Sequence, residues 1–65
     1  MDVWKYNYKK VYLITKDGEK FIGIIIDISE ADETERHEPC ISLELSNGRI
    51  LGFYESEVLS IEEIQ

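Results

Sequence analysis

Apolar and polar residues alternate along most of this 65-residue chain with the period of two that is typical of β-strands. Residues 11–16 are rich in β-branched and aromatic side chains and run into Asp17-Gly18, a dipeptide favoured in tight hairpin turns. Residues 19–28 then resume a strand whose alternate isoleucines share one face: Ile22, Ile24, Ile26 and Ile28. These two segments are therefore predicted to pair as a hairpin.

This second strand also carries apolar side chains on its opposite face, namely Phe21 and Ile25. A small barrel buries only one face of a strand, so the other face needs a cover, either the N-terminal segment or a second subunit. Gly23, in the middle of the run, predicts a sharp bend or a bulge.

The second half of the chain predicts three more strands. Residues 41–46 alternate cleanly and end at Asn47-Gly48, the strongest short hairpin signal, so they should pair with residues 49–54. A fifth strand is entered through a tight turn or one 3₁₀ turn at residues 55–57, and its apolar positions are Val58, Leu59, Ile61 and Ile64.

Residues 29–38 break the alternation with five acidic side chains and no apolar one larger than alanine, which predicts a solvated, mobile loop. The acids here could hold a hard cation weakly, but they lack the order of a calcium loop, and one Cys with one His is too few for zinc. We expect no metal and no cofactor. The candidate cation ligands are the five acids of this loop and Asp27 just before it, with His37 beside them: Asp27, Glu30, Asp32, Glu33, Glu35 and Glu38.

Five short strands joined by tight turns and one long loop predict an all-β fold, a five-stranded SH3-like or Sm-like small barrel with the acidic loop between strands two and three. At 65 residues there is room for one domain, residues 1–65, with an N-terminal arm at 1–10 and the barrel at 11–64. A helical fold is excluded because the two turn dipeptides fall where long helices would have to continue.

A domain this small buries only about 60% of the surface of its unfolded chain, so its core is thin. The lone Cys40 cannot form an intrachain disulfide and favours a reducing compartment, which leaves self-association as the expected source of extra stability. No apolar run approaches the ~20 residues that span a bilayer, so we expect a cytoplasmic protein without membrane insertion.

The net charge of −7 disfavours nucleic acid as a partner, since phosphate binding needs Lys and Arg. The charge is uneven: residues 1–20 carry five Lys against three acids, and residues 21–65 carry two Arg against eleven. Aromatic residues interleave with Lys near the start, on what would be one face of an N-terminal strand. Such a pattern fits base stacking or, better at this net charge, packing against protein. The predicted interaction surface comprises Trp4, Lys5, Tyr6, Tyr8, Phe21, Ile25 and Tyr54.

The order of these elements resembles the Sm-like family, which includes the bacterial host-factor RNA chaperones. Residues 11–18, Gly23 and the strand end at Asp27 are similar to the first Sm motif, and residues 50–64 to the second. The resemblance implies ring formation and RNA binding. The RNA-contacting positions differ, however, because Glu55 and Ser56 stand where the family has Lys and His, and only Tyr54 is kept.

The expected function is therefore a non-catalytic protein-interaction module that self-associates, in the setting of a phage or mobile-element accessory protein. The alternative is a diverged Sm-like RNA-binding protein that uses the N-terminal Lys and aromatic patch. An enzyme is not expected, because His37 and Cys40 are the only nucleophile and base combination, and a chance pair in a loop explains them better.

Overall fold

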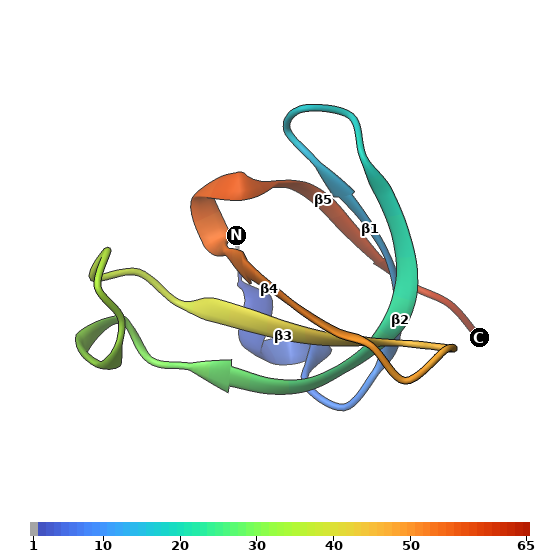
Figure 1. Cartoon of the computed structure of the whole chain (residues 1–65), viewed down its shortest axis with the longest axis horizontal. Coiled ribbons are helices and arrows are strands. Elements are labelled where there is room, and N and C mark those ends of the chain that lie inside the picture. The colour runs from blue at the N-terminus through green and yellow to red at the C-terminus, as the bar shows by residue number, and fades with distance from the viewer. Residues whose placement is uncertain (1) are drawn as a thin grey trace.

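The computed structural model describes residues 2–65 as one five-stranded antiparallel sheet with the strand order β4-β3-β2-β1-β5 (Figure 1). No α-helix occurs in this described part, which confirms the all-β prediction. Of three short 3₁₀ segments, η1 precedes the first strand, and η2 and η3 lie in connections between strands. In chain order the elements are η1 (Val3–Tyr6), β1 (Lys10–Thr15), β2 (Lys20–Ser29), η2 (Ala31–Glu33), β3 (Cys40–Leu45), β4 (Ile50–Tyr54), η3 (Glu55–Glu57) and β5 (Val58–Glu63).

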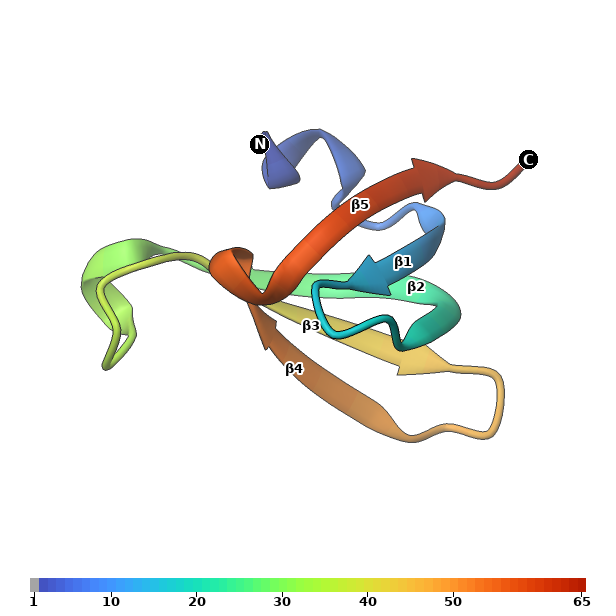
Figure 2. The same cartoon turned by 90° about the horizontal axis from the view of Figure 1, so that it is seen from above.

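The sheet does not close into the predicted barrel. Within the described residues β4 pairs with β3 and β5 pairs with β1, but β4 and β5 do not pair with each other. The two strands meet only at η3 and diverge from it, as Figure 2 shows from above. The 3₁₀ turn expected at residues 55–57 is confirmed, and it sends the chain from one edge of the sheet to the other.

Both hairpin turns form where the sequence predicts them. Gly18 and Gly48 have φ angles of 92° and 86°, a left-handed conformation that glycine adopts without steric cost. Each turn is closed by main-chain hydrogen bonds: the N–H of Gly18 donates to the carbonyl of Thr15 (3.0 Å), and that of Gly48 to the carbonyl of Leu45 (3.0 Å).

The alternation of β2 changes phase in the middle of the strand. Its pairing with β3 slips by one residue between Ile25 and Asp27, so both Ile25 and Ile28 point into the core. Ile22 and Ile24 point outward instead, with 54% and 42% of their surface exposed. The expectation that all four isoleucines share one face is therefore wrong, because a bulge adds one residue to the strand and reverses the side-chain order beyond it.

Gly23 is not itself the bulge. A Cβ at this position would lie 2.4 Å from the carbonyl oxygen of Glu44 and 3.0 Å from the side chain of Leu43. The glycine is thus required by the close approach of β3 on the inner face of β2.

The core fills the concave side of the curved sheet and draws on every strand. Phe21 packs at its margin, with its ring centroid 5.2 Å from that of Phe53. The N-terminal segment also contributes, because η1 places Val3 fully inside the core. This segment forms a 3₁₀ turn and not the strand expected from its alternating aromatics. The buried apolar side chains are Val3, Val11, Leu13, Ile25, Ile28, Ile41, Leu43, Phe53, Val58 and Ile61.

The acidic loop has more internal structure than its composition predicts. Thr34 organises its second half, since its hydroxyl donates to the carbonyl of Glu38 (2.7 Å) and accepts from the Glu38 N–H (3.1 Å). The Glu38 carboxylate then accepts a hydrogen bond from the N–H of Ser56 in η3 (2.7 Å). The loop is thereby tied to the turn between β4 and β5, which lies 18 residues away in sequence.

This tie makes a prediction for the dependence of stability on pH. The Ser56 N–H holds the pKa of Glu38 below its ordinary value of 4.5. A pKa depressed by folding stabilises the fold above the unfolded value, and the effect is lost as pH falls through the folded value. Glu38→Gln should therefore lower the melting temperature near neutral pH, and the difference from wild type should shrink as the pH falls below 4.5.

Thermal melts followed by circular dichroism at several pH values would measure this difference. Glu35→Gln, an exposed glutamate in the same loop, is the matched control and should show a small difference that does not change with pH in this way. If the melting-temperature difference between Glu38→Gln and wild type were the same at every pH, the charge of the Glu38 carboxylate would not contribute to its contact with Ser56.

Candidate interaction surface

The seven residues predicted as an interaction surface do not lie on one face. Ile25 is fully buried, because it lies on the same face of β2 as Gly23, and this face packs against the core. Phe21 and Tyr6 are half-buried and pack against the core. These three residues serve the interior and offer little or no contact area to a partner.

The other four predicted residues are more accessible but dispersed. Trp4 and Tyr8 are 44% and 74% exposed on the N-terminal segment, where the Lys5 ammonium lies 5.1 Å from the centre of the Tyr6 ring. Tyr54 lies at the end of β4 and is half-buried beneath the guanidinium of Arg36, which sits 4.6 Å from its ring centre. Tyr54 thus packs against the acidic loop.

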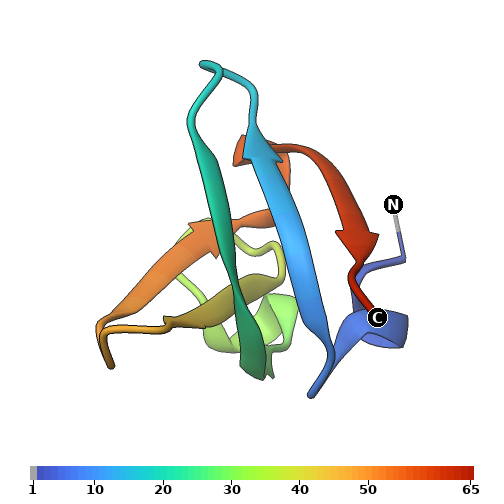
Figure 3. The same ribbon diagram turned by 90° about the vertical axis from the view of Figure 1, so that its right-hand side faces the viewer.

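A different set of side chains forms an apolar surface on the convex side of the sheet. Ile22 and Ile24 of β2 and Ile50 of β4 are 54%, 42% and 57% exposed, and we call these three residues the outer patch. Tyr12, which stands opposite Ile22 on β1, is half-buried beside it. Figure 3 looks onto β2 and β1 from this side, with no other element in front of them.

The outer patch borders an open hollow of about 570 Å³. Its lining comes from β1, β2, β3 and the turn after β3, and combines apolar side chains with one basic, one acidic and one hydroxyl side chain. Residues that line it include Lys10, Ile22, Gly23, Ile24, Glu44 and Leu45. Exposed isoleucine side chains interspersed with a few charged ones can form a contact with another protein.

Sequence reasoning recognised the surplus of apolar residues on β2 but assigned the wrong face to the interior. The signal that could have corrected it is Gly23, because a glycine within a strand marks a close backbone approach, and such an approach occurs on the packed side. The face of β2 that carries Gly23, Phe21 and Ile25 is therefore the inner face. The face on which Ile50 lies could not be predicted from its own strand, since Ile50 is the first residue of β4.

A smaller hollow of about 300 Å³ lies where the β1–β2 turn meets η3, lined by Thr15, Lys16, Asp17, Glu19, Phe53 and Glu57. The Thr15 hydroxyl donates to the Asp17 carboxylate, and this hydrogen bond lowers the pKa of Asp17. The same hydroxyl accepts from the N–H of Glu19 (3.0 Å). These contacts brace the hairpin turn, which is a structural role.

The environment of Cys40 differs from that of a catalytic cysteine. Burial, aided by the negative charges of Glu57 and Glu38, raises the pKa of its thiol. A nucleophilic cysteine needs the opposite shift, because the thiolate is the reactive form. His37, the only histidine, is exposed in the loop, with a positive φ of 55°.

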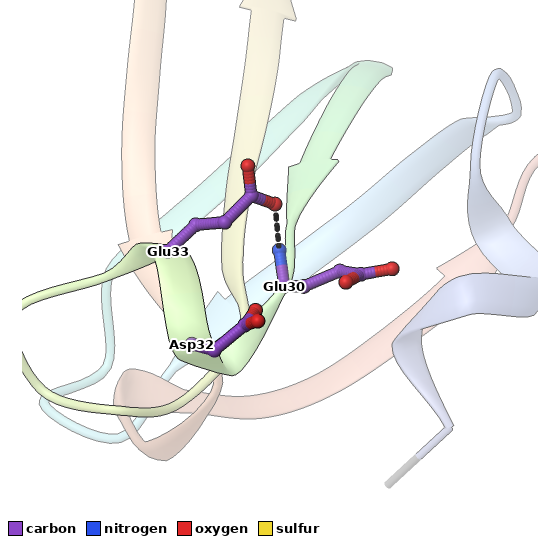
Figure 4. Close-up of side chains that lie close together, drawn as sticks. All are labelled: Glu30, Asp32 and Glu33. Atoms are coloured by element: carbon purple, nitrogen blue, oxygen red, sulfur yellow. Dashed lines mark hydrogen bonds between the residues drawn. The ribbon is translucent and has the colours of Figure 1, made fainter.

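Three acids in the first part of the loop, in and just before η2, lie close together, as Figure 4 shows. Carboxylate oxygens of Glu30, Asp32 and Glu33 lie within 4.8 Å of one another. The Glu33 carboxylate accepts a hydrogen bond from the N–H of Glu30 (3.1 Å), so part of its capacity is used to cap η2. All three side chains are exposed, as is common for solvated surface carboxylates.

No protein-family model, curated protein or solved structure matches this chain. Between residues 2 and 65, no helix has the length and apolar character needed to cross a bilayer.

Proposed function

We propose that this chain is a non-catalytic protein-interaction module that binds another protein through the outer patch. The observation that carries this proposal is the exposure of Ile22, Ile24 and Ile50 on one side of a sheet whose other side is already filled by the core. Exposed apolar surface is stabilised when a partner removes it from water.

We further infer that the fold is an opened relative of the SH3-like or Sm-like small barrels. The strongly curved sheet, its strand order and the 3₁₀ turn between β4 and β5 support this inference. The lone thiol of Cys40 fits a reducing compartment, so we place the protein in the cytoplasm.

The proposal is tested by removing the apolar character of the outer patch without touching the core. Ile22→Thr with Ile24→Thr keeps β-branched side chains, which suit strands, and should leave the fold intact. The matched control is Leu59→Thr, which removes a side chain that is 60% exposed on β5. We expect affinity capture from host cells, after nuclease treatment, to recover the same protein with wild type and Leu59→Thr, and to lose it with the double variant.

Recovery that is equal for all three proteins would contradict the proposal. Recovery that disappears with nuclease, together with salt-sensitive binding to single-stranded RNA, would instead favour the Sm-like RNA-binding alternative. In that case, replacing Trp4 with alanine should remove about 1–3 kcal/mol of base stacking.

A further inference from the structure

A single row of residues crosses the outer face of the sheet from β4 to the end of the chain. The strand register places Ile50 beside Glu44, Glu44 beside Ile24, and Ile24 beside Lys10. The row continues to Ile64, whose N–H donates to the carbonyl of Lys10 (2.8 Å). We call these five residues the outer row.

The outer row reads apolar, acidic, apolar, basic, apolar, with Ile24 at its centre. Reversing the row therefore exchanges Glu44 with Lys10 and leaves the apolar positions apolar. A surface with this property is complementary to a copy of itself turned by a half rotation, which is the requirement for a two-fold symmetric dimer.

We propose that the partner of the outer patch is a second copy of this chain, packed face to face. The two-fold axis lies in the interface between the copies, close to parallel with β2 and directly above Ile24. This inference rests on the proposed function, and it names the partner of that surface. The axis places Ile24 against Ile24 of the other copy. It also places Lys10 of each copy opposite Glu44 of the other, so the two copies form two equivalent ion pairs.

The distances between packed sheets allow these pairs. Sheets that pack face to face lie about 10 Å apart, a gap that a lysine and a glutamate side chain can span together. Packed sheets are also rotated by about 30°. Lys10 and Glu44 lie one strand away from Ile24, about 4.8 Å, so this rotation displaces each pair by only about 2–3 Å.

Lys20 tests the position of the axis. It is exposed on β2 two outward positions before Ile24, about 13 Å along the strand. Figure 1 shows that β2 is convex on this side, so two copies that touch at Ile24 separate toward the strand ends. Lys20 should therefore stay in solvent.

The experiment measures the dimer dissociation constant by analytical ultracentrifugation at protein concentrations up to about 100 µM. We expect wild type to dimerise, and Lys10→Glu or Glu44→Lys alone to weaken the dimer about tenfold, because each replaces two attractive pairs by two repulsive ones. An equimolar mixture of the two single variants should form a heterodimer as tight as the wild-type dimer. Lys20→Glu, the matched control with the same charge change, should remain within about threefold of wild type.

Three outcomes would overturn the proposal, and they are distinguishable from one another. A wild-type chain that stays monomeric at these concentrations refutes the second copy as partner but leaves the proposed function standing. A dimer that persists in Ile22→Thr with Ile24→Thr refutes the outer patch as the dimer contact, and the proposed function is then decided by the affinity-capture result. A dimer that Ile22→Thr with Ile24→Thr abolishes, but that Lys10→Glu and Glu44→Lys both leave within about threefold of wild type, refutes the axis alone.

Discussion

Ile25→Ala is expected to destabilise the fold by about 2–5 kcal/mol, because it leaves a cavity in a site that the chain fills completely. Ile25 has no exposed surface, lies near the middle of β2 and pairs with Leu43 of β3. Chemical denaturation followed by tryptophan fluorescence or circular dichroism would measure the change. For a domain of this size such a loss is a large part of the total stability.

Its matched control is the next residue toward the N-terminus. Ile24→Ala removes the same atoms from a side chain that is 42% exposed, so its cost should be below about 1 kcal/mol. If the two variants lost equal stability, the inward orientation of Ile25 and the outward orientation of Ile24 would both be wrong. Measured at protein concentrations too low for dimerisation, the pair tests which face of β2 is buried within one copy of the chain.

Gly23→Ala is expected to cost about 1–3 kcal/mol even though it adds only one methyl group. The new Cβ would lie 2.4 Å from the carbonyl oxygen of Glu44, so the backbone of β3 would have to move away from β2. That movement strains the pairing that both strands use. The free energy of unfolding from denaturant titration is the appropriate measurement.

Gly52 provides the comparison, because it is also a glycine within a strand of the same sheet. A Cβ there would meet only the Cys40 sulfur, at the ordinary contact distance of 3.8 Å. Gly52→Ala should therefore leave stability unchanged or raise it slightly, since alanine restricts the unfolded chain more than glycine does. Equal losses at the two glycines would argue against the close approach of β3 at Gly23.

The parts of the fold that the sequence predicts correctly depend on local chemistry. Asp17-Gly18 and Asn47-Gly48 need glycine at a positive φ, and any chain with these dipeptides between alternating runs tends to turn there. The 3₁₀ turn at residues 55–57 is likewise predictable, because only three residues separate two strands. These features need no information about distant parts of the chain.

The parts that sequence reasoning missed depend on contacts between distant residues. The bulge between Ile25 and Asp27 arises from the pairing of β2 with β3, and no residue type marks it. Val3 is buried because η1 packs against the core, although its neighbours Trp4 and Tyr6 look like the stronger anchors. The hydrogen bond from Ser56 to Glu38 joins two polar segments. The alternation of apolar and polar residues predicts each of them only as a separate loop or turn.

The opening between β4 and β5 has a consequence for how the protein behaves in solution. β4 is an edge strand of five residues without one charged side chain, and such edges are templates for the addition of strands from other molecules. The surrounding chain carries a net charge of −7 with a pI near 4.5, so mutual repulsion keeps molecules apart at neutral pH. This repulsion disappears as the pH approaches the pI. The acidic residues on the rest of the surface therefore oppose association through β4, a strand that has no charge of its own.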